Sequence, residues 1–105
     1  MNYSNYNLEE RQRDKMHSLD RVIELQPMEG KTPLSSTGAV DKRIFNGENN
    51  LHGLYNNDKG LWEFKYERGD LPGALQCQFT TFNELLNYAR AYFQKRNVEI
   101  KGVIG

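Results

Sequence analysis

The sequence has very few of the residues that build metal sites, disulfide frameworks and nucleophilic active sites. It contains one cysteine, Cys77, and two histidines, His17 and His52, far apart in the chain. A single cysteine excludes an internal disulfide and any cysteine-rich zinc site. No glycine-rich phosphate loop is present, and the many carboxylates stand in no motif. We therefore predict a protein that is not an enzyme, with no catalytic residue, metal, cofactor or small-molecule substrate.

The chain also lacks an excess of either charge. Fourteen basic and fourteen acidic residues give a formal net charge of zero. Nucleic-acid binders usually carry a basic excess, because they gain affinity by releasing counterions from phosphates. The same balance argues against binding to an acidic membrane surface. A nucleic-acid partner is therefore possible but disfavoured.

Long apolar runs are missing as well. No stretch approaches the ~20 apolar residues that a membrane-spanning helix requires, and the polar start of the chain is not typical of a signal peptide. We therefore expect no membrane partner, and a location in the cytoplasm or in a particle assembled there, such as a virion.

Residues 1–26 predict an N-terminal helical segment. Asn7 can cap a helix that has Glu10 in its first turn, and no proline or glycine interrupts residues 8–26. Four apolar residues fall on one side of this helix at helical spacing: Met16, Leu19, Val22 and Ile23. Pro27 is expected to end it.

Residues 27–50 predict an extended arm or linker, because glycine, proline, serine and asparagine punctuate them. The apolar residues Leu34, Ile44 and Phe45 favour an arm that becomes ordered against a partner. A pure linker would not need such anchors.

Residues 51–105 predict a small α+β module. Two strands, 51–55 and 61–67, flank a turn cluster at residues 56–60, and a third strand is expected over residues 75–79. A helix follows, with Thr81 as its cap and Glu84 at capping-box spacing. Its apolar stripe consists of Phe82, Leu85, Leu86, Ala89 and Phe93. Asn97 is a plausible terminator, and a short edge strand follows from Val98.

The predicted fold is therefore α+β. An N-terminal helix and an irregular arm precede a three-stranded antiparallel sheet, which packs on one helix and is followed by a short C-terminal strand. Cys77 is expected to be a buried apolar residue. Trp62, Phe64 and Tyr66 are expected to form the core face under the helix, the alternative being an exposed aromatic platform.

The hairpin, third strand and helix carry a set of residues spread over somewhat under half of the chain: Gly53, Tyr55, Gly60, Trp62, Phe79, Thr81, Glu84 and Ala89. In these residues and in this order of elements the chain resembles the plant ethylene-response type of DNA-binding domain and its phage integrase relatives. The resemblance implies a sheet that lies in the DNA major groove and reads it with arginines and tryptophans on its outer face. Here the arginine-rich first strand is absent, and acidic residues interrupt the basic ones.

In style the chain also resembles a small bacteriophage-encoded protein, because it is short, rich in asparagine and tyrosine, and carries a long arm candidate. Such proteins serve as minor virion components or as inhibitors of a host enzyme. We therefore predict a non-catalytic protein-binding module, a phage accessory or minor structural component of a larger assembly, in the host cytoplasm or the virion. A host-enzyme inhibitor and a nucleic-acid binder are the alternatives.

The predicted sites follow from these readings. The expected protein-binding or self-association residues lie on the arm and on the outer helix face: Leu34, Ile44, Phe45, Tyr88 and Tyr92. The nucleic-acid alternative would use Lys59, Lys65 and Arg68 on the sheet.

Overall fold

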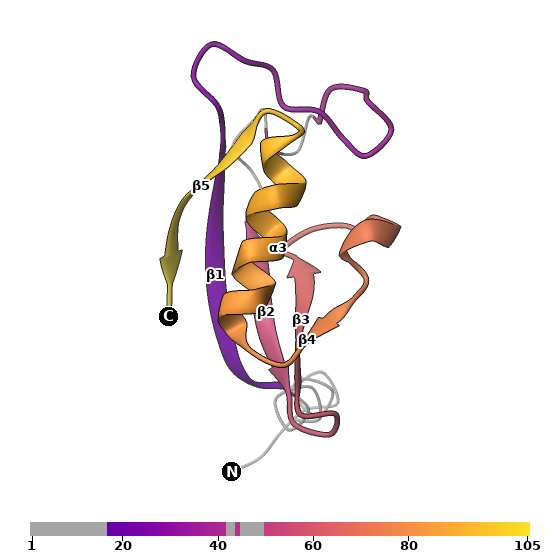
Figure 1. Cartoon of the computed structure of the whole chain (residues 1–105), viewed down its shortest axis with the longest axis vertical. Helices are drawn as coiled ribbons and strands as arrows, with labels where there is room; N and C mark the ends of the chain where they lie inside the picture. Colours follow the sequence, from indigo (N-terminus) through magenta and orange to yellow (C-terminus); the bar gives the residue numbers. More distant parts are fainter. Residues whose placement is uncertain (1–16, 42–43, 45–49) are drawn as a thin grey trace, which may run out of the picture.

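The computed structural model describes residues 17–41, 44 and 50–105. Five antiparallel strands form one sheet in the order β4-β3-β2-β1-β5. Their bounds are β1 His17–Pro27, β2 Leu51–Asn56, β3 Leu61–Tyr66, β4 Gln78–Phe79 and β5 Val98–Ile104. Helix α3 (Phe82–Gln94) lies across one face of the sheet (Figure 1). The α+β class is confirmed.

The predicted N-terminal helix is wrong where the structure describes it, because residues 17–27 form strand β1. This strand lies between β2 and β5 and pairs with both. Pairing on two sides and the burial of Ile23 and Leu25 outweigh the helical spacing of the apolar residues. The adjacent β-branched pair Val22-Ile23 also suits a strand. Residues 8–16 of the predicted helix lie outside the described residues.

The number of strands is also corrected. The sheet has five strands and not three plus a terminal one, since β1 lies inside it and β5 pairs with β1. The predicted third strand over 75–79 shortens to β4. Leu75 ends a 3-10 turn, η1 (Gly73–Leu75), in which its N–H donates to the Pro72 carbonyl at 2.9 Å. The Leu75 side chain is fully buried in the core.

The β2–β3 hairpin is confirmed. The Asn56 side-chain oxygen accepts hydrogen bonds from the N–H groups of Asp58 and Lys59, at 3.0 and 3.1 Å. Gly60 closes the turn with a φ of 67°, a left-handed conformation that glycine adopts without strain. Asparagine side chains commonly stabilise turns by bonding the backbone two or three residues ahead.

Helix α3 begins as predicted. The Thr81 hydroxyl accepts a hydrogen bond from the Glu84 N–H at 3.2 Å and caps the helix. The helix packs closely on β2 at Gly53, where an added Cβ would lie 2.8 Å from a ring carbon of Phe82. Asn97, with a φ of 62°, turns the chain into β5.

The prediction that the β3 aromatics form the core face is confirmed. Phe64 and Tyr66 are buried, and Trp62 packs against the core with its ring 5.1 Å from that of Phe82. Trp62 therefore contacts the helix, on the side opposite to the outer face that the DNA-binding resemblance would use. Cys77 is partly buried against the same core.

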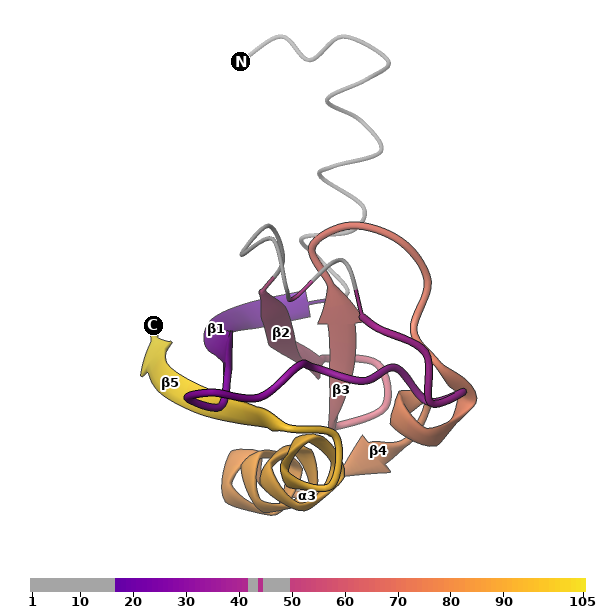
Figure 2. The same ribbon diagram turned by 90° about the horizontal axis from the view of Figure 1, so that it is seen from above.

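Residues 28–41 form a segment that packs on this chain itself; we call it the docked segment. It passes over the C-terminal end of α3 (Figures 1 and 2). The Leu34 N–H donates to the Arg96 carbonyl at 2.9 Å, and the Asn97 side-chain amide donates to the Thr32 carbonyl at 3.0 Å. Within the segment, Leu34 bridges Val40 and Pro33 is buried. The α3–β5 turn thus holds the described part of the predicted arm.

Candidate functional site

Strand β5 forms a free edge of the sheet. It pairs with β1 on one side, and in the described part of the chain no strand pairs with its other side. The opposite edge is β4, which has only two residues. Edge strands present unpaired backbone groups to which another strand can bond. The seven-residue β5 is therefore the sheet's main site for such pairing (Figure 1).

The register shows which backbone groups point outward. The Met28 N–H donates to the Asn97 carbonyl at 2.8 Å, one position beyond the β1–β5 ladder. Hydrogen-bonded and non-hydrogen-bonded pairs alternate along an antiparallel ladder. The pairs of Pro27 with Val98 and of Leu25 with Ile100 are therefore non-hydrogen-bonded. The N–H and C=O groups of Val98 and Ile100 point away from β1.

A groove lies beside this edge, between β5 and α3. It has a volume of about 270 Å³ and is lined by Met28, Arg90, Gln94, Val98, Glu99 and Ile100. Its floor is apolar, because Val98 is buried and Ile100 packs partly against the core. A free strand edge beside an apolar groove is an arrangement that binds extended peptides, with the backbone on the edge and the side chains in the groove.

Charges flank Ile100 on both sides. Glu99 and Lys101 are exposed, and the alternation of a strand places them on the face opposite to α3. The Gln26 side-chain amide donates to a Glu99 carboxylate oxygen at 2.5 Å and orients it. A β-bulge follows, because Gly102 is opposite Glu24 and Ile100 is opposite Leu25, which leaves Lys101 as the extra residue.

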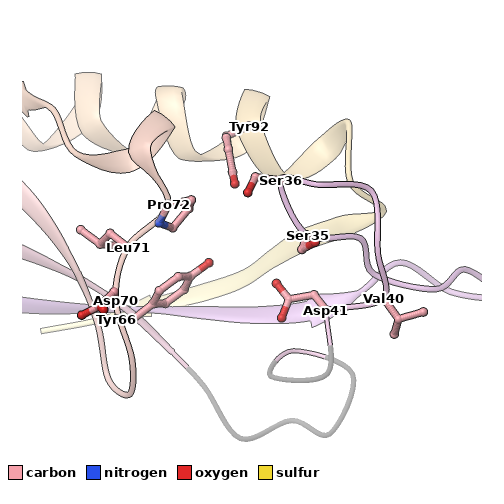
Figure 3. A pocket seen from close by; sticks show the side chains of 9 residues that line it. All are labelled: Ser35, Ser36, Val40, Asp41, Tyr66, Asp70, Leu71, Pro72 and Tyr92. Atoms are coloured by element: carbon pink, nitrogen blue, oxygen red, sulfur yellow. The ribbon is translucent and has the colours of Figure 1, made fainter.

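A second hollow of about 440 Å³ lies where the docked segment meets β3, α3 and the loop before η1 (Figure 3). Hydroxyl and carboxylate groups line much of it, from Ser35, Ser36, Asp41, Tyr66, Asp70 and Tyr92; its apolar residues are Val40, Leu71 and Pro72. These groups can form hydrogen bonds with a polar molecule. Its described lining residues include no histidine, cysteine or lysine.

The predicted arm anchors lie in different environments. Ile44 is 1% exposed and belongs to the main core, and Leu34 is half-buried in the docked segment. Phe45 lies outside the described residues. Ile44 therefore anchors its segment to the chain's own core, and the prediction that these residues contact a partner stays a prediction.

The two predicted helix tyrosines are not equivalent. Tyr92 is 9% exposed and packs in the core, while Tyr88 is 39% exposed. The Tyr88 hydroxyl donates to the Ala74 carbonyl at 2.6 Å, and its ring packs beside Phe79. Partial burial, followed by the influence of the neighbouring Cys77 thiol, raises the pKa of Tyr88 above its ordinary value. Only Tyr88 offers part of its ring to a partner.

The three basic residues of the nucleic-acid alternative are spread along β3. Lys59 and Arg68 lie beyond opposite ends of the strand, and Lys65 lies between them. The Lys59 ammonium is 3.2 Å from a carboxylate oxygen of Glu63, and Glu67 also interrupts the row. The result is a strip of mixed charge and not a basic patch.

His52 is hydrogen-bonded. Its Nδ1 lies 2.7 Å from a carboxylate oxygen of Asp20, on the sheet face opposite to α3. In the described residues no group of three or more histidine, cysteine, aspartate or glutamate side chains could hold a metal ion. Nor does the described structure contain a helix long and apolar enough to cross a membrane.

Sequence reasoning identified a terminal edge strand but missed the groove beside it. The alternation of Val98 and Ile100 with Glu99 and Lys101 was the available signal. The groove also needs Met28 and Arg90, which the fold brings from the docked segment and the helix. No family model, no curated protein and no solved structure matches this chain.

Proposed function

We propose that this protein is a non-catalytic protein-binding module that pairs through the free edge of β5 with an extended strand of another protein chain. The observation that carries the proposal is the outward-pointing backbone of Val98 and Ile100 beside a groove with an apolar floor. Main-chain hydrogen bonds supply affinity in this mode, and side-chain pockets supply specificity. The module would serve as an accessory or structural component of a larger assembly.

The groove supports this proposal by its mixture of groups. Val98 and Ile100 offer an apolar floor, while Arg90 and Gln94 are exposed side chains of α3 at the rim. Interfaces combine an apolar centre with a polar rim in the same way, and arginine is enriched in them. A small domain also gains stability from a partner, since its own core is limited.

The test compares wild type with Ile100→Lys in affinity capture from a lysate of the source cells. An inward-pointing charge on an edge strand prevents strand addition. The matched control is Ile104→Lys, the same change at an exposed position of the same strand, where the side chain is 57% exposed. Circular dichroism establishes that each variant is folded.

We expect wild type and Ile104→Lys to capture a partner chain, which is either another protein or a second copy of this one. Ile100→Lys should not capture it. A single retained host enzyme would assign the module to inhibition, and virion proteins would assign it to assembly. Equal retention by all three proteins would show that binding does not use this edge. Retention of nothing, together with a monomeric state at every concentration, would overturn the proposal.

A further inference from the structure

We infer that the strand that pairs with β5 is β5 of a second copy of this chain. In this arrangement the two strands run antiparallel about a two-fold axis at Ile100. The inference rests on the proposed function, because it uses the same edge. It adds the identity of the partner and the register of pairing.

The backbone of Ile100 permits this symmetry. Its N–H and C=O groups both point away from β1. In an antiparallel pair, two directly opposed residues of this kind exchange both hydrogen bonds. Ile100 of one copy would therefore bond Ile100 of the other twice. A two-fold symmetric interface requires this self-complementarity, since each copy contributes the same surface.

The charges around Ile100 are complementary in this register. Glu99 of one copy lies directly opposite Lys101 of the other, and the symmetry makes the pair twice. These residues form the non-hydrogen-bonded positions of the new ladder, where opposed side chains are closest. Both are exposed and lie on the same face of the sheet. Opposite charges at facing positions stabilise strand pairing.

The bulge lies at both ends of this pairing. Lys101 is the extra residue of β5, and bulges bend an edge strand and interrupt its ladder. In the register centred on Ile100, Lys101 of each copy lies opposite Glu99 of the other. The regular residues before the bulge therefore supply the central hydrogen-bonded pair, and one bulge stands at each end of the new ladder. Bulges at an edge oppose further strand addition, which leaves one closed pair.

The two-fold axis also brings the two grooves together. Because antiparallel pairing about this axis continues one sheet, both α3 helices lie on the same face of it. The groove lined by Met28, Val98 and Ile100 in one copy then faces the same groove in the other. The part of Ile100 that is exposed in one chain becomes covered, which supplies the apolar centre of the interface.

The experiment is a charge exchange measured by sedimentation equilibrium over a concentration series at low salt. Its variants are Glu99→Lys, Lys101→Glu and the double variant that carries both changes. Each single variant places like charges opposite each other at both pairs, and the double variant restores opposite charges with the signs reversed. Thermal melts of dilute samples monitor the folding of each protein, because Glu99 also bonds Gln26 within the chain.

We expect wild type to dimerise, each single variant to raise the dimer Kd about tenfold or more, and the double variant to return it toward the wild-type value. Added salt should raise the wild-type Kd, because the charge pairs are exposed. A wild type that stays monomeric at about 1 mM would overturn the inference. So would a dimer whose Kd is the same in all four proteins. If lysate capture still depends on Ile100 in that case, the proposed strand addition stands and its partner is a different protein.

Discussion

The Tyr88 side chain stabilises the fold with its hydroxyl and is also partly exposed to solvent. Its hydroxyl donates to the Ala74 carbonyl and so ties the middle of α3 to η1, while more than a third of the residue stays in solvent. The sequence placed Tyr88 and Tyr92 together at the edge of the helix stripe. The structure separates them, because Arg96 stacks at 3.8 Å over the Tyr92 ring and Tyr92 belongs to the core.

The pKa of Tyr88 yields a pH-dependent prediction. Folding raises this pKa above the unfolded value near 10.0, chiefly through burial. The stabilisation is therefore fully present below pH 10 and is lost as the pH rises through the higher folded-state pKa. Tyr88→Phe should lower stability by at most about 1 kcal/mol at neutral pH. The difference from wild type should shrink in alkaline solution.

Urea unfolding of both proteins from about pH 7 to about pH 11 measures this difference. Comparing the two proteins cancels the titration of the other tyrosines and of the lysines, which they share. A difference that stays constant across the range would show that the hydroxyl proton does not contribute to stability.

At the scale of elements, α3 was the most predictable part of the chain. Its cap, its first acidic residue and its apolar stripe are local features, because each depends on residues only a few positions apart in the sequence. The hairpin of β2 and β3 was predictable for the same reason, since its turn is closed by the side chain of Asn56. Strand β1 was not, because its partners lie far away in the sequence.

The cap of α3 can be tested with two neighbouring threonines. Thr81→Ala should lower the free energy of unfolding by about 1 kcal/mol, because the Glu84 N–H loses its acceptor. Thr80→Ala is the matched control, since the Thr80 hydroxyl only donates to the exposed Glu84 carboxylate. Chemical denaturation of both variants gives the comparison. An equal loss in both would contradict the assignment of Thr81 as the cap.

At the scale of the whole molecule, the docked segment is part of the connection between β1 and β2, and it packs against the C-terminal end of α3. Its backbone bonds to Arg96 and Asn97 hold it on this chain, and its side chains complete one wall of the hollow in Figure 3. Residues with the composition of a linker can therefore be ordered by their own fold.

Asn97→Gly tests this docking. Glycine keeps the positive φ of the turn but removes the side-chain amide that donates to Thr32. Amide hydrogen exchange at Leu34 should accelerate by up to about tenfold, the equivalent of one hydrogen bond. Exchange at Ile23, inside the sheet, should not change. Equal acceleration at both positions would show that the variant lowers the stability of the whole fold, and it would contradict a local role of the amide in docking. Asn97→Ala is the comparison: it removes the same amide and adds backbone strain at the positive φ. It should therefore accelerate exchange at Ile23 as well, which Asn97→Gly should not.

The sequence by itself determined the α+β class, the β2–β3 hairpin, helix α3 with its cap, and the aromatic core face of β3. These depend on periodicity and on contacts between residues close in the chain, which a single sequence displays. Only the tertiary structure decided that residues 17–27 are a central strand, that Ile44 belongs to the core, and that β5 is a free edge beside a groove. Each of these depends on which distant segments pair, and the free energy of that pairing exceeds the local preferences that the sequence shows.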